Sequence, residues 1–355
     1  MRIGLVAALT LLMGCSTLAA PSPVPLPTPA TASPRALVID TDMAVDDWMA
    51  ILYLLQRPEV TISAITVTGA GESHCAPGIQ HVLGLATLSG YGPLRVACGR
   101  ETPLQGHHAF PTRWREEVDR LLGLTLPEGQ NLASPLTAVE LLASVIQTSP
   151  NKVTLLTLGP LTNLAETLQT HPAVRDHIER LYIMGGAVKV PGNVSTTGVG
   201  IHHPVAEWNV YVDPYAAKVV LHAGVPITLV PLDATNQVPV TAQFYTRLQR
   251  NHRSPEAAFV FDMLSKQKAF IDSGDYYFWD PLAAAILTDD SLATFQNQNL
   301  CVVETEEPDS GRTQVGLGCP AVQVAVSADR ERFEQLFLET LNTVSWPLGG
   351  TVLPP

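Results

Sequence analysis

Residues 36–55 read ALVIDTDMAVDDWMAILYLL, and the rest of the chain is organised around this stretch. An apolar run typical of a buried strand comes first and one typical of a helix comes last, with four carboxylates between them: Asp40, Asp42, Asp46 and Asp47. In open α/β sheets, ligands bind in the crevice outside the carboxyl ends of the strands. Crowded carboxylates repel one another unless a cation or protons intervene, and their hard oxygens suit Ca²⁺ or Mg²⁺. The stretch therefore predicts a metal site held by acids.

The composition is that of an ordinary globular protein. The 355 residues are 46% hydrophobic and 15% charged, which is enough to bury a sizeable core as one large α/β domain or two smaller ones. The formal net charge of −12 disfavours nucleic acid as a partner and suits a protein that handles neutral or cationic small molecules. Homo-oligomerisation is left open by the sequence.

The N-terminus resembles an export signal. Residues 1–15 contain one arginine and a short apolar core, too short to span a bilayer, and they end in a Leu-Met-Gly-Cys sequence that resembles a lipobox. We expect the protein to be exported and lipid-anchored through Cys15 to a bacterial membrane, in the periplasm or at the cell surface; a plain secretory signal is the alternative. The expected organisation is a signal peptide at 1–15, a Pro-rich linker at 16–34 and a folded domain at 35–355.

Strand-like and helix-like segments alternate along the chain, which predicts a mostly parallel sheet with crossover helices on both faces. After the opening stretch, we expect strands at 60–68, 94–97, 153–158, 181–184 and 227–231. We expect helices at 47–56, 77–89, 135–148, 214–222, 282–287 and 328–343, and a mostly helical section at 241–271. Residues 101–133 are expected to be irregular, and because loops of this length are usually functional, we interpret them as a lid.

Two disulfides are expected, because export places the cysteines in an oxidising compartment. Cys301 and Cys319 bracket two strand-like segments around a Pro-Asp-Ser-Gly turn at 308–311, which predicts a small C-terminal hairpin closed by a bridge at its base. We also expect a bridge between Cys75 and Cys98.

The opening stretch resembles the signature of the calcium-dependent nucleoside hydrolases, in which an apolar strand is followed by Asp-Thr-Asp-x-x-x-Asp-Asp and an apolar helix. Further matches follow in the same order: Leu158-Gly159-Pro160-Leu161-Thr162-Asn163, Met184-Gly185-Gly186, Asn193, Glu207-Trp208-Asn209 and Trp279-Asp280. The resemblance implies a single Rossmann-like α/β domain with a mixed central sheet. It also implies hydrolysis of N-ribosides to ribose and free base.

The resemblance further implies roles for individual residues. Asp42, Asp47 and Asp280 match side-chain ligands of Ca²⁺, and the main-chain carbonyl of Leu158 matches another ligand. Asp42 also matches the general base that takes a proton from a calcium-bound water. The residues that match contacts to the ribose hydroxyls are Asp46, Asn193, Glu207 and Asn209.

The residues near the base depart from the family pattern. In pyrimidine-accepting members a histidine precedes the last metal-binding aspartate, whereas Trp279 in this chain resembles the purine-preferring members. We therefore expect Trp279 to stack on the base, to make its ring nitrogen easier to protonate, and to favour purine ribonucleosides. Glu72 stands where many members have asparagine and is expected to contact the substrate. The usual Pro-Gly of the first motif is Met43-Ala44, which we expect to alter the turn that carries Asp46.

Other residues have structural interpretations. We expect Asp40 to order the first motif and Asn163 to cap or order the start of its helix. The pairs His107-His108 and His202-His203 lack the spacing of a zinc site, and we interpret them as solvated loop residues or as contacts of the lid or the base.

Two other functions compete with the hydrolase. A phosphatase of the haloacid dehalogenase type would use Asp40 as a nucleophile with Mg²⁺, but it leaves Asp46-Asp47 and Trp279-Asp280 unexplained. A surface lipoprotein that binds nucleosides without cleaving them would agree with the anchor and the altered first motif. The retained metal ligands argue against that alternative.

Overall fold

The computed structural model describes residues 34–129, 133–195, 201, 203–305 and 308–343. All of these residues belong to one compact unit that begins at Pro34. The predicted signal peptide, Cys15 and all but the last residue of the predicted linker lie outside the described residues. Within the described ranges, no helix has both the length and the apolar character needed to cross a membrane.

The described strands form one nine-stranded sheet in the order β3-β2-β1-β4-β5-β6-β9-β7-β8. Neighbours from β3 to β9 are parallel, whereas β7 is antiparallel to both β9 and β8. The strands are β1 (Arg35–Thr41), β2 (Val60–Val67), β3 (Val96–Cys98), β4 (Val153–Thr157), β5 (Ile178–Met184), β6 (Ile227–Val230), β7 (Ala293–Val302), β8 (Thr313–Val315) and β9 (Ala321–Ala328). The predicted mixed, mostly parallel sheet is confirmed. The order reverses between β1 and β4, and such a switch point is where ligands bind in these sheets.

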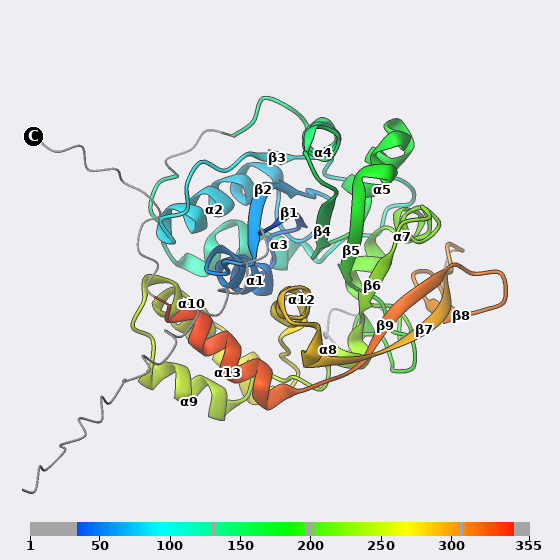
Figure 1. Cartoon of the computed structure of the whole chain (residues 1–355). Coiled ribbons are helices and arrows are strands. Elements are labelled where there is room, and N and C mark those ends of the chain that lie inside the picture. The colour runs from blue at the N-terminus through cyan, green and yellow to red at the C-terminus, as the bar shows by residue number, and fades with distance from the viewer. Residues whose placement is uncertain (1–33, 130–132, 196–200, 202, 306–307, 344–355) are drawn as a thin grey trace, which may run out of the picture. The chain divides into compact units, whose positions relative to one another are not determined.

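Helices cover both faces of the sheet (Figure 1). One face packs against α1 (Val45–Leu55), α2 (Cys75–Leu88), α12 (Trp279–Thr288) and α13 (Arg330–Leu341), and the other against α4 (Ala138–Thr148), α5 (Thr162–Thr170) and α7 (Pro214–Leu221). The remaining helices are α3 (Thr112–Asp119), α6 (Trp208–Val212), α8 (Leu232–Thr235), α9 (Ala242–Arg250), α10 (Pro255–Lys266) and α11 (Lys268–Ser273). Leu37 and Ile39 of β1 belong to the first core and Val38 to the second, as expected for a strand buried on both faces.

The prediction that residues 101–133 are irregular was wrong for part of the segment. It contains α3 and a 3-10 turn at Leu121–Gly123. Two ion pairs at i,i+4 spacing lie along α3, between Arg113 and Glu117 (Nε to Oε1, 2.9 Å) and between Glu116 and Arg120 (Oε2 to Nη1, 3.8 Å). Such pairs stabilise an exposed helix, so the charge pattern was the available signal for α3.

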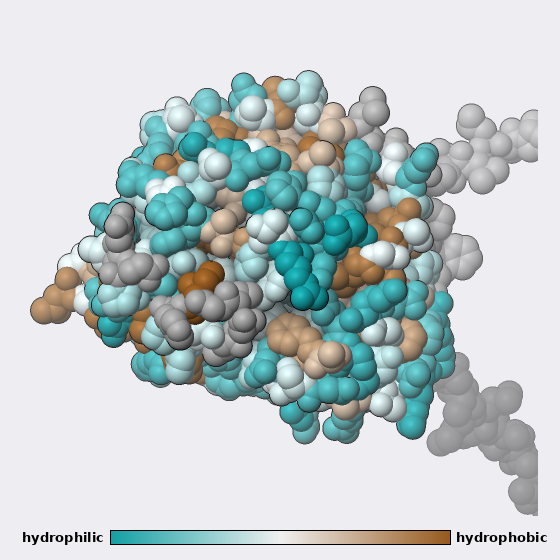
Figure 2. All heavy atoms as spheres, turned by 180° about the vertical axis from the view of Figure 1, so that it is seen from behind, coloured by the Kyte–Doolittle hydropathy of each residue, from teal (hydrophilic) through white to brown (hydrophobic). Residues whose placement is uncertain are grey.

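The predicted C-terminal hairpin is present as β7 and β8, but its first strand has a second partner that was not predicted. Strand β9 lies between β6 and β7 and joins the hairpin to the main sheet. At the far end of the hairpin, the side chains of Val315 and Leu317 are exposed. Figure 2 shows apolar atoms at this protruding end of the molecule.

Both predicted disulfides are present. Cys301 and Cys319 have Cα atoms 5.2 Å apart and link β7 to the segment before β9. Cys75 and Cys98 have Cα atoms 5.5 Å apart and link the first residue of α2 to the last residue of β3. The second bridge fixes the end of the loop that contains Glu72.

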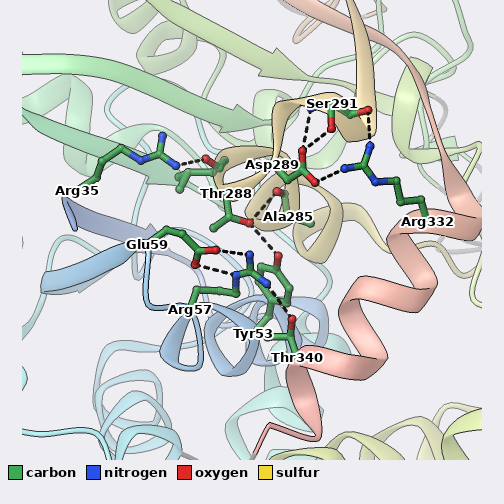
Figure 3. Close-up of polar contacts among 11 residues, drawn as sticks. Arg35, Tyr53, Arg57, Glu59, Ala285, Thr288, Asp289, Ser291, Arg332 and Thr340 are labelled. Carbon is green, nitrogen blue, oxygen red and sulfur yellow. Dashed lines mark hydrogen bonds and ion pairs between the residues drawn. The ribbon is translucent and has the colours of Figure 1, made fainter. Parts of the chain in front are cut away.

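Polar contacts fix the C-terminal end of α12 against β1, α1 and α13 (Figure 3). Arg35 of β1 donates from Nη2 to the carbonyl of Leu287 at 2.6 Å, and the hydroxyl groups of Tyr53 and Thr288 lie 2.8 Å apart. Asp289 accepts from Nη2 of Arg332 at 2.6 Å. Because α1 and α12 also pack side by side, their N-terminal turns, each with acidic residues, are held next to each other.

Candidate active site

Four carboxylates from three segments meet beyond the end of β1. Asp42 directly follows β1, Asp46 and Asp47 lie in the first turn of α1, and Asp280 lies in the first turn of α12. Asp46, Asp47 and Asp280 can each offer an oxygen within 4.8 Å of the others, as metal ligands do. The sequence predicted that Asp46 contacts the ribose and that Asp42 binds the metal. In the structure, Asp46 lies close to Asp47 and Asp280, and Asp42 lies next to Asp47.

The turn between β1 and α1 has an unusual backbone. Met43 is a non-glycine residue with φ of 58°, in the left-handed region. Its amide donates to the Thr41 hydroxyl at 3.0 Å and its carbonyl accepts from Nε1 of Trp48 at 2.9 Å, while the Thr41 hydroxyl donates to Asp47. These contacts compensate for the strain of the left-handed residue and orient Asp47. The replacement of Pro-Gly by Met43-Ala44 is thus accommodated in this turn.

Asp42 is enclosed by two glycines. Its carboxylate accepts from the amide of Glu72 at 3.1 Å and from that of Ala44 at 3.4 Å. A Cβ atom added to Gly71 would lie 2.1 Å from Cβ of Asp42, and one added to Gly159 would lie 2.6 Å from it. Only residues without a side chain fit at these two positions.

Burial of these acids alters their pKa values. Burial, and then the charges of neighbouring acids, raise the pKa of Asp46 and of Asp47 to about 7. The same causes raise the pKa of Asp42 and of Asp280 well above the usual range. Without a counter-ion, the group would therefore hold protons near neutral pH.

The donor set fits a hard divalent cation. Oδ2 of Asp47 is buried and has no hydrogen-bond partner among the described residues, although Oδ1 accepts from Thr41. An unpaired buried carboxylate oxygen is costly, and a cation would satisfy it. The carbonyl of Leu158, just beyond β4, lines the same cavity and accepts from Nδ2 of Asn209 at 2.8 Å. It keeps a second lone pair for another contact.

Main-chain contacts fix the predicted ribose-binding residues. Glu207 caps α6 and accepts from the amides of Asn209 (2.8 Å), Gly186 (2.9 Å) and Val210 (3.2 Å). Oδ1 of Asn193 accepts from the amide of Trp208 at 3.1 Å. Asn193, Glu207 and Asn209 all line the cavity that contains the acids.

This cavity has a volume of about 690 Å³. The sequence motifs predicted the lining residues near the acids but not most of the aromatic and polar side chains farther out. Those come from the segment with α3 and from the region around α11, namely Phe110, Trp114, Glu117, Val118, Leu122, Gln267, Phe270, Ser273 and Asp275. The position of α3 over the cavity agrees with the predicted lid, although the segment is partly helical.

Trp279 and Glu72 both line the cavity. Trp279 begins α12, three residues earlier than the predicted helix, and its ring centroid lies 5.7 Å from that of Tyr276 and 5.8 Å from that of Tyr277. Its Nε1 is buried without a hydrogen-bond partner in the described part of the chain. Burial, and then the charges of Asp42 and Asp46, raise the pKa of Glu72 well above the usual range.

Asp40 and Asn163 form a structural pair. Oδ1 of Asp40 accepts from the Thr66 hydroxyl at 2.6 Å and from Nδ2 of Asn163 at 2.8 Å, and the same Nδ2 donates to the carbonyl of Val67 at 3.0 Å. Asp40 thus orders the motif, as predicted. Asn163 ties β1 and β2 to α5, and its side chain makes no capping hydrogen bond.

His107, His108 and His203, the described members of the two histidine pairs, do not line the cavity. His108 stacks on Tyr211 with ring centroids 4.1 Å apart, and the buried His203 lies 4.7 Å from the same ring. His202 lies outside the described residues. None of the described cavity-lining residues is a histidine, so a contact of these pairs with the base is not supported.

The chain matches the inosine-uridine preferring nucleoside hydrolase family over residues 37–335. It belongs to this family. This nucleoside hydrolase is 33% identical over 321 residues to the pyrimidine-specific ribonucleoside hydrolase RihA of Shewanella woodyi. The alignment covers 88% of this chain and 99% of the relative. The membership removes the phosphatase alternative, in agreement with the structural role of Asp40.

Two solved nucleoside hydrolases have similar folds. The inosine-uridine preferring nucleoside hydrolase from Bacillus anthracis is 26% identical with a TM-score of 0.76, and the match covers 87% of this chain and 99% of that chain. The purine-preferring ribonucleoside hydrolase from Gardnerella vaginalis is 26% identical with a TM-score of 0.74, covering 87% and 98%. The fold and the enzyme class of this nucleoside hydrolase are therefore established, whereas the names of its relatives differ on the preferred base.

Gly71→Ala should impair this nucleoside hydrolase. The new methyl group would displace Asp42, so we expect kcat/KM for inosine to fall at least about tenfold and the protein to lose about 1–3 kcal/mol of stability. Gly92→Ala is the matched control, because no described heavy atom lies within 4 Å of its added Cβ. Steady-state kinetics and thermal melts measure both effects, and equal behaviour of the two variants would contradict the close approach of Gly71 to Asp42.

Proposed function

We propose that this enzyme cleaves the N-glycosidic bond of ribonucleosides, purine ribonucleosides preferentially, and releases ribose and free base. The main support is the placement of the four acids in one cavity with Glu207 and Asn209, whose orientations main-chain contacts fix. Acids on one side and fixed polar groups on the other suit a hydroxyl-rich sugar, since each buried unpaired polar group costs about 1–3 kcal/mol.

Asp42 is the general base of the proposed mechanism. Two main-chain amides hold its carboxylate at the cavity, where it accepts a proton from the attacking water. The water forms a bond to the anomeric carbon as the C–N bond breaks, and the electron pair of that bond leaves with the base. Positive charge that develops on the sugar is stabilised by the surrounding carboxylates.

We assign Ca²⁺ as the cation, with Asp42, Asp47, Asp280 and the carbonyl of Leu158 to hold it. When bound, Ca²⁺ would contact sugar hydroxyls and lower the pKa of a nearby water. The unpaired Oδ2 of Asp47 supports a cation at this position. Asp46, Asn193, Glu207 and Asn209 are the proposed contacts of the ribose, and Asp46 also lies within reach of the cation.

Trp279 supports the purine preference. Its ring lines the cavity beside Tyr277 and presents an aromatic surface on which a bicyclic base can stack. The name of the Shewanella woodyi relative points to pyrimidines, and that of the Gardnerella vaginalis structure points to purines. Rates of base release from inosine, adenosine and uridine by the purified protein, with and without chelator, test the proposal. Faster cleavage of uridine would refute the preference, and tight binding without release of base would refute the hydrolase.

Replacement of Trp279 by alanine should act mainly on purines. Loss of base stacking is worth about 1–3 kcal/mol, so we expect kcat/KM for inosine to fall about five- to a hundredfold and that for uridine to fall less. Trp279→Phe keeps an aromatic face and should restore most of the activity. Equal losses for inosine and uridine would show that Trp279 does not select the base.

We also propose export and lipid anchoring through Cys15. The two disulfides support an oxidising compartment, since such bonds are rare in the bacterial cytosol. Metabolic labelling with a radioactive fatty acid tests the anchor, with Cys15→Ser as the variant that should lose the label.

A further inference from the structure

The charge of the cavity is strongly one-sided. Eight of the described lining residues are acidic, and none is a lysine, arginine or histidine. The acidic residues are Asp42, Asp46, Asp47, Glu72, Glu117, Glu207, Asp275 and Asp280. A divalent cation offsets only part of this charge, and Glu72, Glu117 and Asp275 lie outside the four-acid group. The space left for the base is therefore bordered by carboxyl groups with no positively charged side chain among the described lining residues.

The same space has aromatic walls. Phe110 stacks on Trp208 with ring centroids 5.0 Å apart, and Trp114 lies 5.4 Å from Trp208. Phe270 and Trp279 line the cavity from the region around α11 and α12. Aromatic faces combined with carboxylates recognise delocalised or alkylated cations, because the faces of the rings attract positive charge.

The nearby guanidinium groups offset only part of this charge. Arg113 pairs with Glu117, but its own side chain is 85% exposed and does not line the cavity. Nη2 of Arg115 donates to the carbonyl of Gly69 at 2.7 Å, and this side chain does not line the cavity either. Arg113 is exposed, so solvent screens its charge, whereas Arg115 has a buried Nε and its charge acts on Glu72.

Departure of a neutral base requires a proton on a ring nitrogen. No lysine or histidine is present among the described residues that line the cavity. The hydroxyl of Tyr276 already donates its proton to the sulfur of Met263, at 3.9 Å. A base that already carries a fixed positive charge needs no such proton. Cleavage of its C–N bond returns the electron pair to the ring nitrogen, which becomes neutral.

We propose that the cavity selects ribonucleosides whose base carries a fixed positive charge, the N7-alkylated purines and the N-substituted pyridiniums, over their neutral counterparts. This inference rests on the proposed function and names its substrate class. In the balanced reaction, water forms the new bond to the anomeric carbon, the C–N bond breaks, and the products are ribose, a neutral base and one proton taken up through Asp42.

Binding of matched ligands tests the role of charge. Nicotinamide riboside is cationic, and benzamide riboside has the same outline with a neutral carbon at the position of the charged nitrogen. Each competes with inosine in the assay of the purified enzyme with added Ca²⁺. We expect nicotinamide riboside to bind about two- to thirtyfold more tightly, the range of a desolvated cation over aromatic faces. Equal or weaker binding would overturn the proposal.

Turnover and two variants complete the test. We expect kcat/KM for 7-methylguanosine to exceed that for guanosine at least about tenfold, because the alkylated base departs without a proton. Glu72→Gln and Glu117→Gln should reduce the binding ratio of the two ribosides by about three- to tenfold, since each removes one carboxyl group that a nearby cation would hold ionised. Glu116→Gln is the control on α3, because Glu116 does not line the cavity.

The outcomes separate this inference from the proposed function. If neither guanosine nor 7-methylguanosine releases base, the hydrolase proposal fails. If guanosine is cleaved and the cationic ligands show no advantage, only the charge selection fails. A binding ratio that all three glutamate variants leave unchanged would also refute the role of the acidic wall.

Discussion

Replacement of Asp42 by asparagine is expected to lower kcat/KM for inosine by about 10²- to 10⁴-fold, the usual contribution of a general base. The asparagine keeps the size of the side chain but cannot accept the proton of the attacking water. Circular dichroism and a thermal melt of the same variant show whether its fold is intact.

Asp40→Asn is the matched control for this loss. Both of the hydrogen bonds that the side chain of Asp40 accepts end on a single oxygen, Oδ1, so an asparagine oriented with its carbonyl there keeps the contacts to Thr66 and Asn163. Burial raises the pKa of Asp40 to about 7, so a neutral side chain is tolerated at this position. We expect Asp40→Asn to stay within about tenfold of the parent. Equal losses for both variants would contradict a specific role of Asp42 as the base.

Removal of the cation is expected to destabilise the protein more at high pH than at low pH. The folded-state pKa of Asp46 and of Asp47 is raised from 3.8 to about 7. The stability of the chelated protein is greatest below the pKa that these groups have in the unfolded chain. It is lost as the pH rises through their pKa in the folded protein, because the buried groups must then ionise. For one fully buried group such as Asp47, the loss in free energy of unfolding above pH 7 is about 4 kcal/mol. The losses for the four acids are not additive, because the acids interact with one another.

A bound cation reverses this penalty, because it requires the ionised acids that the bare fold disfavours. The difference in Tm between calcium-loaded and chelated protein should therefore be small near about pH 5 and large near about pH 8. Asp47→Asn removes one of the coupled charges and should flatten the pH dependence of the chelated form. The same difference in Tm at both pH values would show that no cation binds at these acids.

The centre of the fold and the class of enzyme could be predicted from the sequence. The opening strand and helix were recognisable because β1 is apolar on both faces and α1 follows a dense group of acids. Leu158 and Asp280, far apart in the chain, could be named only because their motifs resemble those of the nucleoside hydrolases; one lies just after a strand and the other at the start of a helix. Both positions border the same crevice when strands are parallel.

The remaining details depended on geometry that the sequence does not encode locally. The oxygens of Asp46, Asp47 and Asp280 lie within 4.8 Å of one another, a grouping that depends on side-chain placement and not on the spacing of the motif. Helix α3 was missed because its residues are mostly polar and its stabilising charge pairs are weak. Strand β9 pairs with β7 close by in the chain and also with β6, about 90 residues earlier, and no local pattern indicates this second pairing.

The origin of Asp280 has a consequence for biosynthesis. Its amide donates to Asp46 at 3.4 Å across a separation of 234 residues, so the acidic group is complete only when α12 has docked against α1. A chain that is released or translocated from its N-terminus first carries Asp42, Asp46 and Asp47 without their partner for most of its synthesis. The full acidic group therefore requires the chain to have folded through α12, and chains truncated before α12 would lack Asp280.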